Sequence, residues 1–208
     1  MSNAMKYLLE ARPEAMGSYF KFLKEAGTHL DPKTRDLISV ITKVDVQTEN
    51  GLRQYLSRAL RGGCTPNEII DALLMAFPTL GLAKIIWAVD IILEMDISDF
   101  TTQALNADEA WHDIGALDDF NDGTAAYVKS DYRSVFVYRN GDAVKVYDST
   151  CPHQVTNIPK SGICDHHLTC PKHSWKFDLK TGDCVEKGNH PLKSFEVRVT
   201  DGMVQAWW

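Results

Sequence analysis

The chain has 208 residues, of which 44% are hydrophobic and 24% are charged, and its formal net charge is −6. This composition excludes a disordered chain and predicts a globular protein with a buried core, in one large domain or two small ones. The acidic balance disfavours nucleic acid as a partner, because the phosphate backbone would face charge of its own sign.

Neither a membrane span nor a secretory signal is expected. The most apolar stretch, 69–95, is interrupted by charged residues and a proline, so it never reaches the roughly 18 uninterrupted apolar residues of a membrane span. The N-terminus lacks a basic region followed by an apolar one. The five cysteines are an odd number without a secretory signal, which favours ligands and free thiols over disulfides. We therefore expect a cytoplasmic protein that has no membrane partner.

Residues 5–95 are predicted to be entirely helical, because their apolar residues recur at helical spacing. Asp31 followed by Pro32 is typical of a helix start, with an N-cap and a proline at the first position. Thr65 followed three residues later by Glu68 predicts a capping box at the start of another helix. The N-terminal half is therefore expected to be a helical bundle.

Three segments of this half, at 30–40, 58–63 and 67–73, resemble the carboxymuconolactone decarboxylase and alkylhydroperoxidase-like helical family. The resemblance covers about residues 28–95. Peroxidatic members of that family carry Cys-x-x-Cys-x-x-x-His, in which a thiolate attacks the peroxide and the histidine relays protons.

The corresponding positions here hold Thr48, Gly51 and Tyr55, so a hydroperoxide-reducing enzyme is not expected. Asp36, near the family's acidic relay position, then has no thiol or histidine to serve and is expected on the helix surface. Cys64 is the only cysteine of the helical half, so it lacks a resolving partner there. The helical half is predicted to be a scaffold that forms a homo-oligomer or docks a partner, with binding of a small apolar ligand as the alternative.

After about residue 98 the pattern changes to short runs rich in valine, tyrosine and phenylalanine. The run 134–147 turns at an Asn-Gly-Asp sequence, and the run 196–207 turns at Asp-Gly. Alternating apolar residues on both sides of such turns predict β-hairpins. The C-terminal half is therefore expected to be a small antiparallel β domain.

Two short segments of the β half combine cysteine and histidine: Cys151-Pro-His153 and, after sixteen residues, Cys170-Pro-Lys-His173. Thiolates and imidazoles suit either iron-sulfur clusters or zinc. Zinc sites more often pair Cys with Cys and His with His, whereas here each loop supplies one of each, which permits two cysteines on one iron and two histidines on the other. A structural zinc site in an interaction module stays open as the alternative.

The second loop continues as Cys-Pro-Lys-His-Ser-Trp-Lys-Phe-Asp at 170–178 and Leu-Lys-Thr-Gly-Asp-Cys at 179–184. These segments resemble the Rieske ferredoxins and the N-terminal domains of ring-hydroxylating oxygenases, and the resemblance covers roughly residues 110–208. It implies one Rieske-type 2Fe-2S cluster per chain. The resemblance also implies that the irons of this cluster are bound by Cys151, His153, Cys170 and His173.

The fold class predicted from these patterns is multidomain: an all-α helical bundle followed by an all-β Rieske-type antiparallel β domain with a cluster-binding subdomain. The predicted boundaries are 1–100 for the helical alkylhydroperoxidase-like domain, 101–109 for a linker and 110–208 for the Rieske domain.

The resemblance also bears on the reduction potential. High-potential Rieske proteins place a serine two residues and a tyrosine four residues after the second histidine ligand, and this chain has Trp175 and Phe177 there. The positions of their loop-bridging disulfide hold Thr156 and Lys172. A hydrogen bond to a cluster sulfur stabilises the reduced form, so its absence predicts a potential low in the Rieske range.

These features predict one-electron transfer by a ferredoxin-like component that accepts electrons from a flavin-dependent reductase and feeds a terminal oxygenase, such as a dioxygenase, or another reductase. The chain ends thirty residues after Asp178, so we expect no mononuclear-iron domain and no substrate turnover by the chain alone. A protein like the small subunit of nitrite reductase is the alternative within electron transfer.

Overall fold

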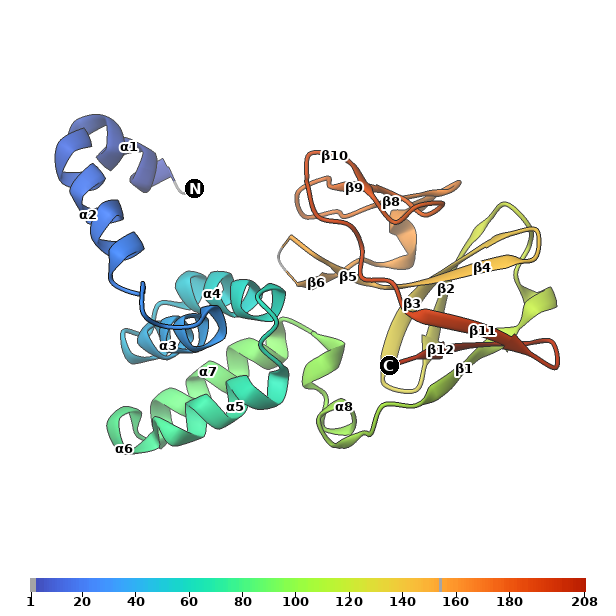
Figure 1. Cartoon of the computed structure of the whole chain (residues 1–208), viewed down its shortest axis with the longest axis horizontal. Helices are drawn as coiled ribbons and strands as arrows, with labels where there is room; N and C mark the ends of the chain where they lie inside the picture. Colours follow the sequence, from blue (N-terminus) through green and yellow to red (C-terminus); the bar gives the residue numbers. More distant parts are fainter. Residues whose placement is uncertain (1–2, 154) are drawn as a thin grey trace.

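The computed structural model describes residues 3–153 and 155–208, which form a helical part and a β part side by side (Figure 1). The helical elements are α1 (Asn3–Ala11), α2 (Pro13–Glu25), α3 (Pro32–Asp45), α4 (Glu49–Arg61), α5 (Pro66–Met75), α6 (Phe77–Leu80), α7 (Leu82–Glu94) and α8 (Thr102–Asn106), with 3-10 turns at Ser98–Phe100, Leu117–Asp119 and Lys160–Gly162.

The predicted helix starts are confirmed. The Asp31 carboxylate accepts a hydrogen bond of 3.0 Å from the backbone N–H of Thr34, at the start of α3. At the start of α5, the Thr65 hydroxyl accepts from the Glu68 N–H at 3.1 Å, while the Glu68 carboxylate accepts from the Thr65 N–H at 2.7 Å. These caps satisfy N–H groups that have no partner within the helix.

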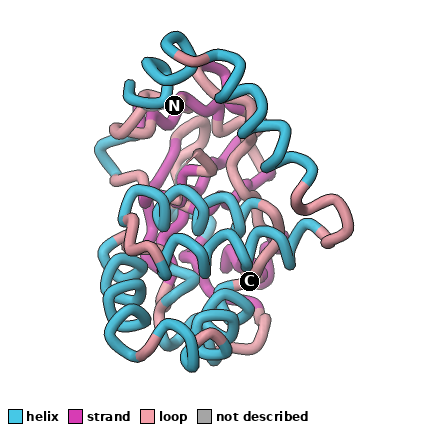
Figure 2. Tube along the Cα trace, turned by 90° about the vertical axis from the view of Figure 1, so that its left-hand side faces the viewer, coloured by secondary structure: helices cyan, strands magenta, loops and turns pink. Residues whose placement is uncertain are grey.

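The core of the helical part lies between α3, α4, α5 and α7. Figure 2, viewed from the helical side, shows helices in front of the strands. By contrast, α1 and α2 contain no buried residue and extend away from the other helices in Figure 1. The fully buried side chains of the core include Val40, Val44, Leu52, Leu56, Ile69 and Leu73.

The β part consists of short strands. They are β1 (Trp111–Ala116), β2 (Ala125–Ser130), β3 (Arg133–Asn140), β4 (Ala143–Asp148), β5 (Thr150–Cys151), β6 (Thr156–Asn157), β7 (Ile163–Cys164), β8 (His167–Thr169), β9 (Lys176–Asp178), β10 (Cys184–Glu186), β11 (Glu196–Thr200) and β12 (Met203–Trp207).

Within the described residues the strands form antiparallel sheets in the orders β2-β3-β4, β1-β12-β11, β10-β9-β8-β7 and β5-β6. Both predicted hairpins are present, as β3-β4 and β11-β12. Asp201 and Gly202 have φ values of 51° and 77°, as the tight turn of the second hairpin requires. The sheet β10-β9-β8-β7 and the pair β5-β6 carry the predicted ligand loops, and their core, which includes Leu168, Phe177 and Leu179, is continuous with Phe136 and Tyr147 of the sheet β2-β3-β4.

The predicted order of an all-α part followed by an antiparallel β part is confirmed. The segment predicted as a linker contains α8, and the domain boundaries stay predictions. No helix among the described residues has the length and apolar character needed to cross a membrane.

Candidate metal centre

The two loops that carry the predicted ligands have the same backbone design. In the first, which joins β5 to β6, the N–H of Val155 donates to the carbonyl of Cys151 at 2.9 Å. In the second, the N–H of Ser174 donates to the carbonyl of Cys170, also at 2.9 Å. Val155 and Ser174 both have left-handed backbones, with φ of 48° and 56°. Each loop is therefore a closed turn that begins at its cysteine.

These turns place the two predicted cysteine ligands in one hydrophobic core and the two predicted histidine ligands against each other. Cys151 and Cys170 are buried, with 1% and 2% of their surface exposed. The His153 and His173 rings lie 4.7 Å apart between centroids and nearly perpendicular, at 89°. Burial, the neighbouring His173 and the charge of Arg61 lower the pKa of His153, which favours the neutral ring that binds metals.

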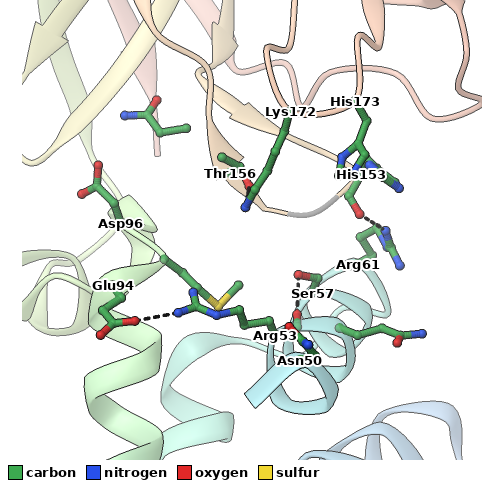
Figure 3. A pocket seen from close by; sticks show the side chains of 13 residues that line it. Asn50, Arg53, Ser57, Arg61, Glu94, Asp96, His153, Thr156, Lys172 and His173 are labelled. Carbon is green, nitrogen blue, oxygen red and sulfur yellow. Dashed lines mark hydrogen bonds and ion pairs between the residues drawn. The ribbon is translucent and has the colours of Figure 1, made fainter. Parts of the chain in front are cut away.

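The residues present fit the 2Fe-2S cluster that the spacing predicts. Two buried thiols can bind one iron as thiolates, and two imidazoles at the edge can bind the other. The burial of the cysteines also shields that side from water, while the histidine side faces a cleft (Figure 3).

The Trp175 side chain lies against the histidine edge of the site. Its ring stacks on that of His153, with centroids 4.6 Å apart and planes 18° from parallel. Gly188 lies against the indole so closely that a Cβ there would come within 2.2 Å of it. Phe177, fully buried, packs in the same core. The segment around Gly188 therefore holds Trp175, and through it the His153 ring, in place.

The helical part contacts the first ligand loop directly. Arg61, the last residue of α4, donates from Nη1 to the carbonyl oxygens of His153 at 2.6 Å and Pro152 at 3.2 Å, and Figure 3 shows the bond to His153. The Val155 side chain is buried in the hydrophobic core of the helical part. The loop that carries two of the candidate ligands thus belongs to the cores of both parts.

A cleft of about 770 Å³ separates α4 and the end of α7 from the ligand loops (Figure 3). Its walls are polar, and one of them includes both histidines. On the helical wall, Arg53 forms an ion pair with Glu94 at 2.6 Å, which joins α4 to α7. The remaining lining residues on the helical side are Asn50, Gln54, Ser57, Arg61, Met95 and Asp96, and those on the loop side are Thr156, Asn157 and Lys172.

The positions of the family's peroxidatic residues lie at and within α4. The expectation that Asp36 lies on the helix surface is wrong: the side chain is 5% exposed and forms an ion pair with Arg58 Nε at 3.0 Å. Helical periodicity could not reveal this, because the pairing joins two helices. Burial raises the pKa of the Cys64 thiol, which disfavours the reactive thiolate.

Sequence reasoning also missed Arg61 and Val155. A basic residue in the last turn of a helix is ordinary, since it complements the helix dipole, and a valine in a short loop carries no signal of its own. Only the folded chain shows that they bridge α4 and the ligand loop.

Comparison with known proteins supports both halves of this description. Residues 110–196 match the family model of the Rieske [2Fe-2S] domain, and residues 13–94 match that of the carboxymuconolactone decarboxylase family. The chain therefore joins a helical domain of the second family to a Rieske domain, and the Rieske domain binds a 2Fe-2S cluster. Its general role is electron transfer through this cluster.

Among curated relatives, the chain is 27% identical over 97 residues to the anthranilate 1,2-dioxygenase ferredoxin subunit of Burkholderia cepacia, covering 46% of this chain and 89% of that one. It is 26% identical over 102 residues to the nitrite reductase (NADH) small subunit of Salmonella typhimurium, covering 46% and 94%. A chain in the solved complex of reduced oxygenase and oxidized ferredoxin of carbazole 1,9a-dioxygenase is 29% identical, with a TM-score of 0.39, covering 46% and 91%.

The contact between Gly188 and Trp175 generates a first prediction. In Gly188→Ala, the new methyl group has to displace the indole, so the domain should lose about 1–3 kcal/mol of stability and the cluster should be lost faster on warming. The loss can be followed by visible absorbance. Gly17→Ala is the matched control, because nothing lies within 4 Å of a Cβ there. Equal cluster lifetimes in the two variants would contradict the supporting role of Trp175.

Proposed function

We propose that the chain is a ferredoxin-like electron-transfer component that accepts electrons from a flavin-dependent reductase and delivers them to a terminal oxygenase or another reductase. The main observation behind this proposal is that the two sides of the site differ. The cysteines are buried on one side, and the two histidine rings line a cleft on the other. The similarity to a dioxygenase ferredoxin subunit over most of that protein's length supports an oxygenase as the recipient.

We propose Cys151 and Cys170 as the ligands of the inner iron and His153 and His173 as the ligands of the outer one. When bound, the cluster supplies one-electron redox chemistry. The histidines form the edge at which a partner can approach, Trp175 orients one of their rings, and the buried cysteines exclude water from the opposite side. None of these roles requires the chain itself to bind the substrate of the terminal enzyme.

The similarity to the nitrite reductase small subunit favours a second candidate, in which the recipient is a reductase and not an oxygenase. Both candidates use the same edge of the cluster. Co-purification of the full chain from native cells, with identification of the bound redox partner, separates them.

The ligand assignment predicts that the purified chain is red-brown and holds about two irons and two acid-labile sulfides. Cys151→Ser and Cys170→Ser should each lose most of the iron, because a thiolate ligand is removed. Cys64→Ser and Cys184→Ser are matched controls that should keep it. Iron and sulfide analysis is the measurement, and zinc as the dominant metal would overturn the assignment.

The reduction potential is expected at the low end of the roughly −150 to +300 mV Rieske range, because neither Trp175 nor Phe177 carries a hydroxyl group that could donate to the cluster. The Arg61 guanidinium beside the loop favours the reduced, more negative cluster. Arg61→Gln should therefore lower the midpoint further, by the equivalent of about 1 kcal/mol or less because this side chain is exposed, whereas Arg61→Lys should retain most of the charge effect. Protein-film voltammetry tests both, and a midpoint above about +100 mV would refute the ferredoxin-like assignment.

We further propose that the chain forms a homo-oligomer through its helical domain. Apolar side chains are exposed on two faces: one on α1 and α2, which bury nothing within the chain, and one on α5, α6 and α7. A second copy would cover such faces with the same chemistry. The residues of the first face are Tyr7, Leu8, Tyr19, Phe20, Phe22 and Leu23, and those of the second are Leu74, Met75, Phe77, Leu82, Ile86 and Leu93.

Light scattering of the full chain should therefore give a mass above that of one chain. Phe22→Ser, which removes a side chain that is 64% exposed, should shift the equilibrium toward the monomer. Lys21→Ser on the same helix is the control and should not. A monomer at tens of micromolar for the unaltered chain would exclude the proposal.

A further inference from the structure

The sheet β10-β9-β8-β7 carries a row of metal-binding side chains that the cluster does not use. Cys164 on β7 pairs with His167 on β8, and His167 pairs in turn with Asp178 on β9. Residues directly opposite one another in antiparallel strands point to the same face of the sheet. The thiol, the imidazole and the carboxylate therefore share one face, in three neighbouring strands.

His166, in the turn before β8, adds a second imidazole to this row. One ligand atom each from His166, His167 and Asp178 lies within 4.8 Å of the other two, and all three residues are half-buried. Ligands about 2.0–2.2 Å from a zinc ion in tetrahedral geometry are separated by roughly 3.3–3.6 Å. Small rotations of these side chains are enough to close that gap.

The backbone already holds two of these residues in position. The Asp178 carboxylate accepts from the Lys180 N–H at 2.8 Å through Oδ1, which leaves its other oxygen available. The carbonyl of His166 accepts from the Leu179 N–H at 2.8 Å, which ties the turn to the end of β9. A hydrogen bond to a ligating carboxylate, like the one that Asp178 accepts, orients metal ligands in known sites, whereas the bond to His166 fixes only its backbone.

Within the part of the chain that the structure describes, no charged side chain competes for these groups, and the bond from the Lys180 N–H is the hydrogen bond that the Asp178 carboxylate accepts. Neither imidazole forms a hydrogen bond or an ion pair, and the two rings contact each other with centroids 4.1 Å apart. Asp178 likewise forms no ion pair among the described residues. A cross-strand carboxylate that served only to neutralise a basic side chain would be paired, and this one is not.

We propose that His166, His167 and Asp178 bind a divalent cation of the Zn²⁺ class. Cys164 lies outside this group of close ligand atoms, but it is exposed and directly opposite His167 on β7, and we propose that its thiol turns in as the fourth ligand. Two imidazoles, one carboxylate and one thiolate are donors that Zn²⁺ accepts in tetrahedral sites. His167 and Cys170 are three positions apart along β8 and its end, so the site lies about 10 Å along the strand from the cluster loop. The ion would clamp β7, β8 and β9 together behind that loop.

The test uses the cluster-loaded full chain, freed of loosely bound metal, and titrates it with ZnCl₂ by calorimetry. One Zn²⁺ should bind per chain without loss of iron or of the visible spectrum, and it should raise the unfolding temperature. Asp178→Asn, which can still accept the Lys180 hydrogen bond, and His167→Ala should each weaken binding by at least about tenfold. Cys164→Ser should weaken it as well.

His29→Ala, on the helical domain, is the control and should bind Zn²⁺ like the unaltered chain. Iron content and visible absorbance show that each variant is folded and loaded. Absence of binding, affinities unchanged in both Asp178→Asn and His167→Ala, or zinc uptake matched by iron release would overturn the proposal. The last outcome would place the zinc at the cluster ligands and would leave the electron-transfer proposal to be judged by its own tests.

Discussion

The arrangement around the candidate metal centre depends on one contact between the domains: the guanidinium of Arg61 on the carbonyl oxygens of Pro152 and His153. These carbonyls belong to the turn that begins at Cys151. Val155, four residues after this cysteine, has a left-handed backbone with φ of 48°. A β-branched residue in that conformation is unfavourable by about 1–3 kcal/mol. The surroundings have to compensate for this, and the burial of the Val155 side chain in the helical core does so. The helical domain thus stabilises the shape of the first ligand loop.

The same contact determines what lies in front of the histidines. Because α4 is fixed against the loop, the His153 and His173 rings border a cleft of about 770 Å³ and do not stand on an open convex surface. The polar walls, with Arg61 and Lys172 beside the histidines and Glu94 and Asp96 opposite them, suit a charged segment better than an apolar one.

The features that could be predicted from the sequence are those encoded by neighbouring residues. A capping box can be predicted from Thr65 and Glu68 alone, and a hairpin turn from Asp201 and Gly202 alone. The pattern of candidate ligands likewise needs only two short loops. The contacts that could not be predicted join distant segments. Arg61 and His153 are 92 positions apart, and the burial of Asp36 depends on a different helix. The expectation that Asp36 lies on the surface rested on the missing thiol and histidine of the family motif, because a carboxylate without a partner is normally exposed, and nothing in the local sequence marks Arg58 as its partner.

The ion pair between the buried Asp36 and the half-exposed Arg58 links the helical domain, which lacks peroxidatic residues, to the support of the first ligand loop. Asp36 on α3 holds Arg58, one turn before the end of α4, at 3.0 Å. Just beyond that end, a Cβ on Gly62 would come within 2.7 Å of Asp36 Oδ2, so a larger residue there would have to displace the carboxylate. Arg61 lies between these two contacts and reaches the ligand loop from a fixed helix end. In this protein, the acidic residue near the family's relay position therefore has a structural role, because it fixes the helix end from which Arg61 supports the loop carrying Cys151 and His153.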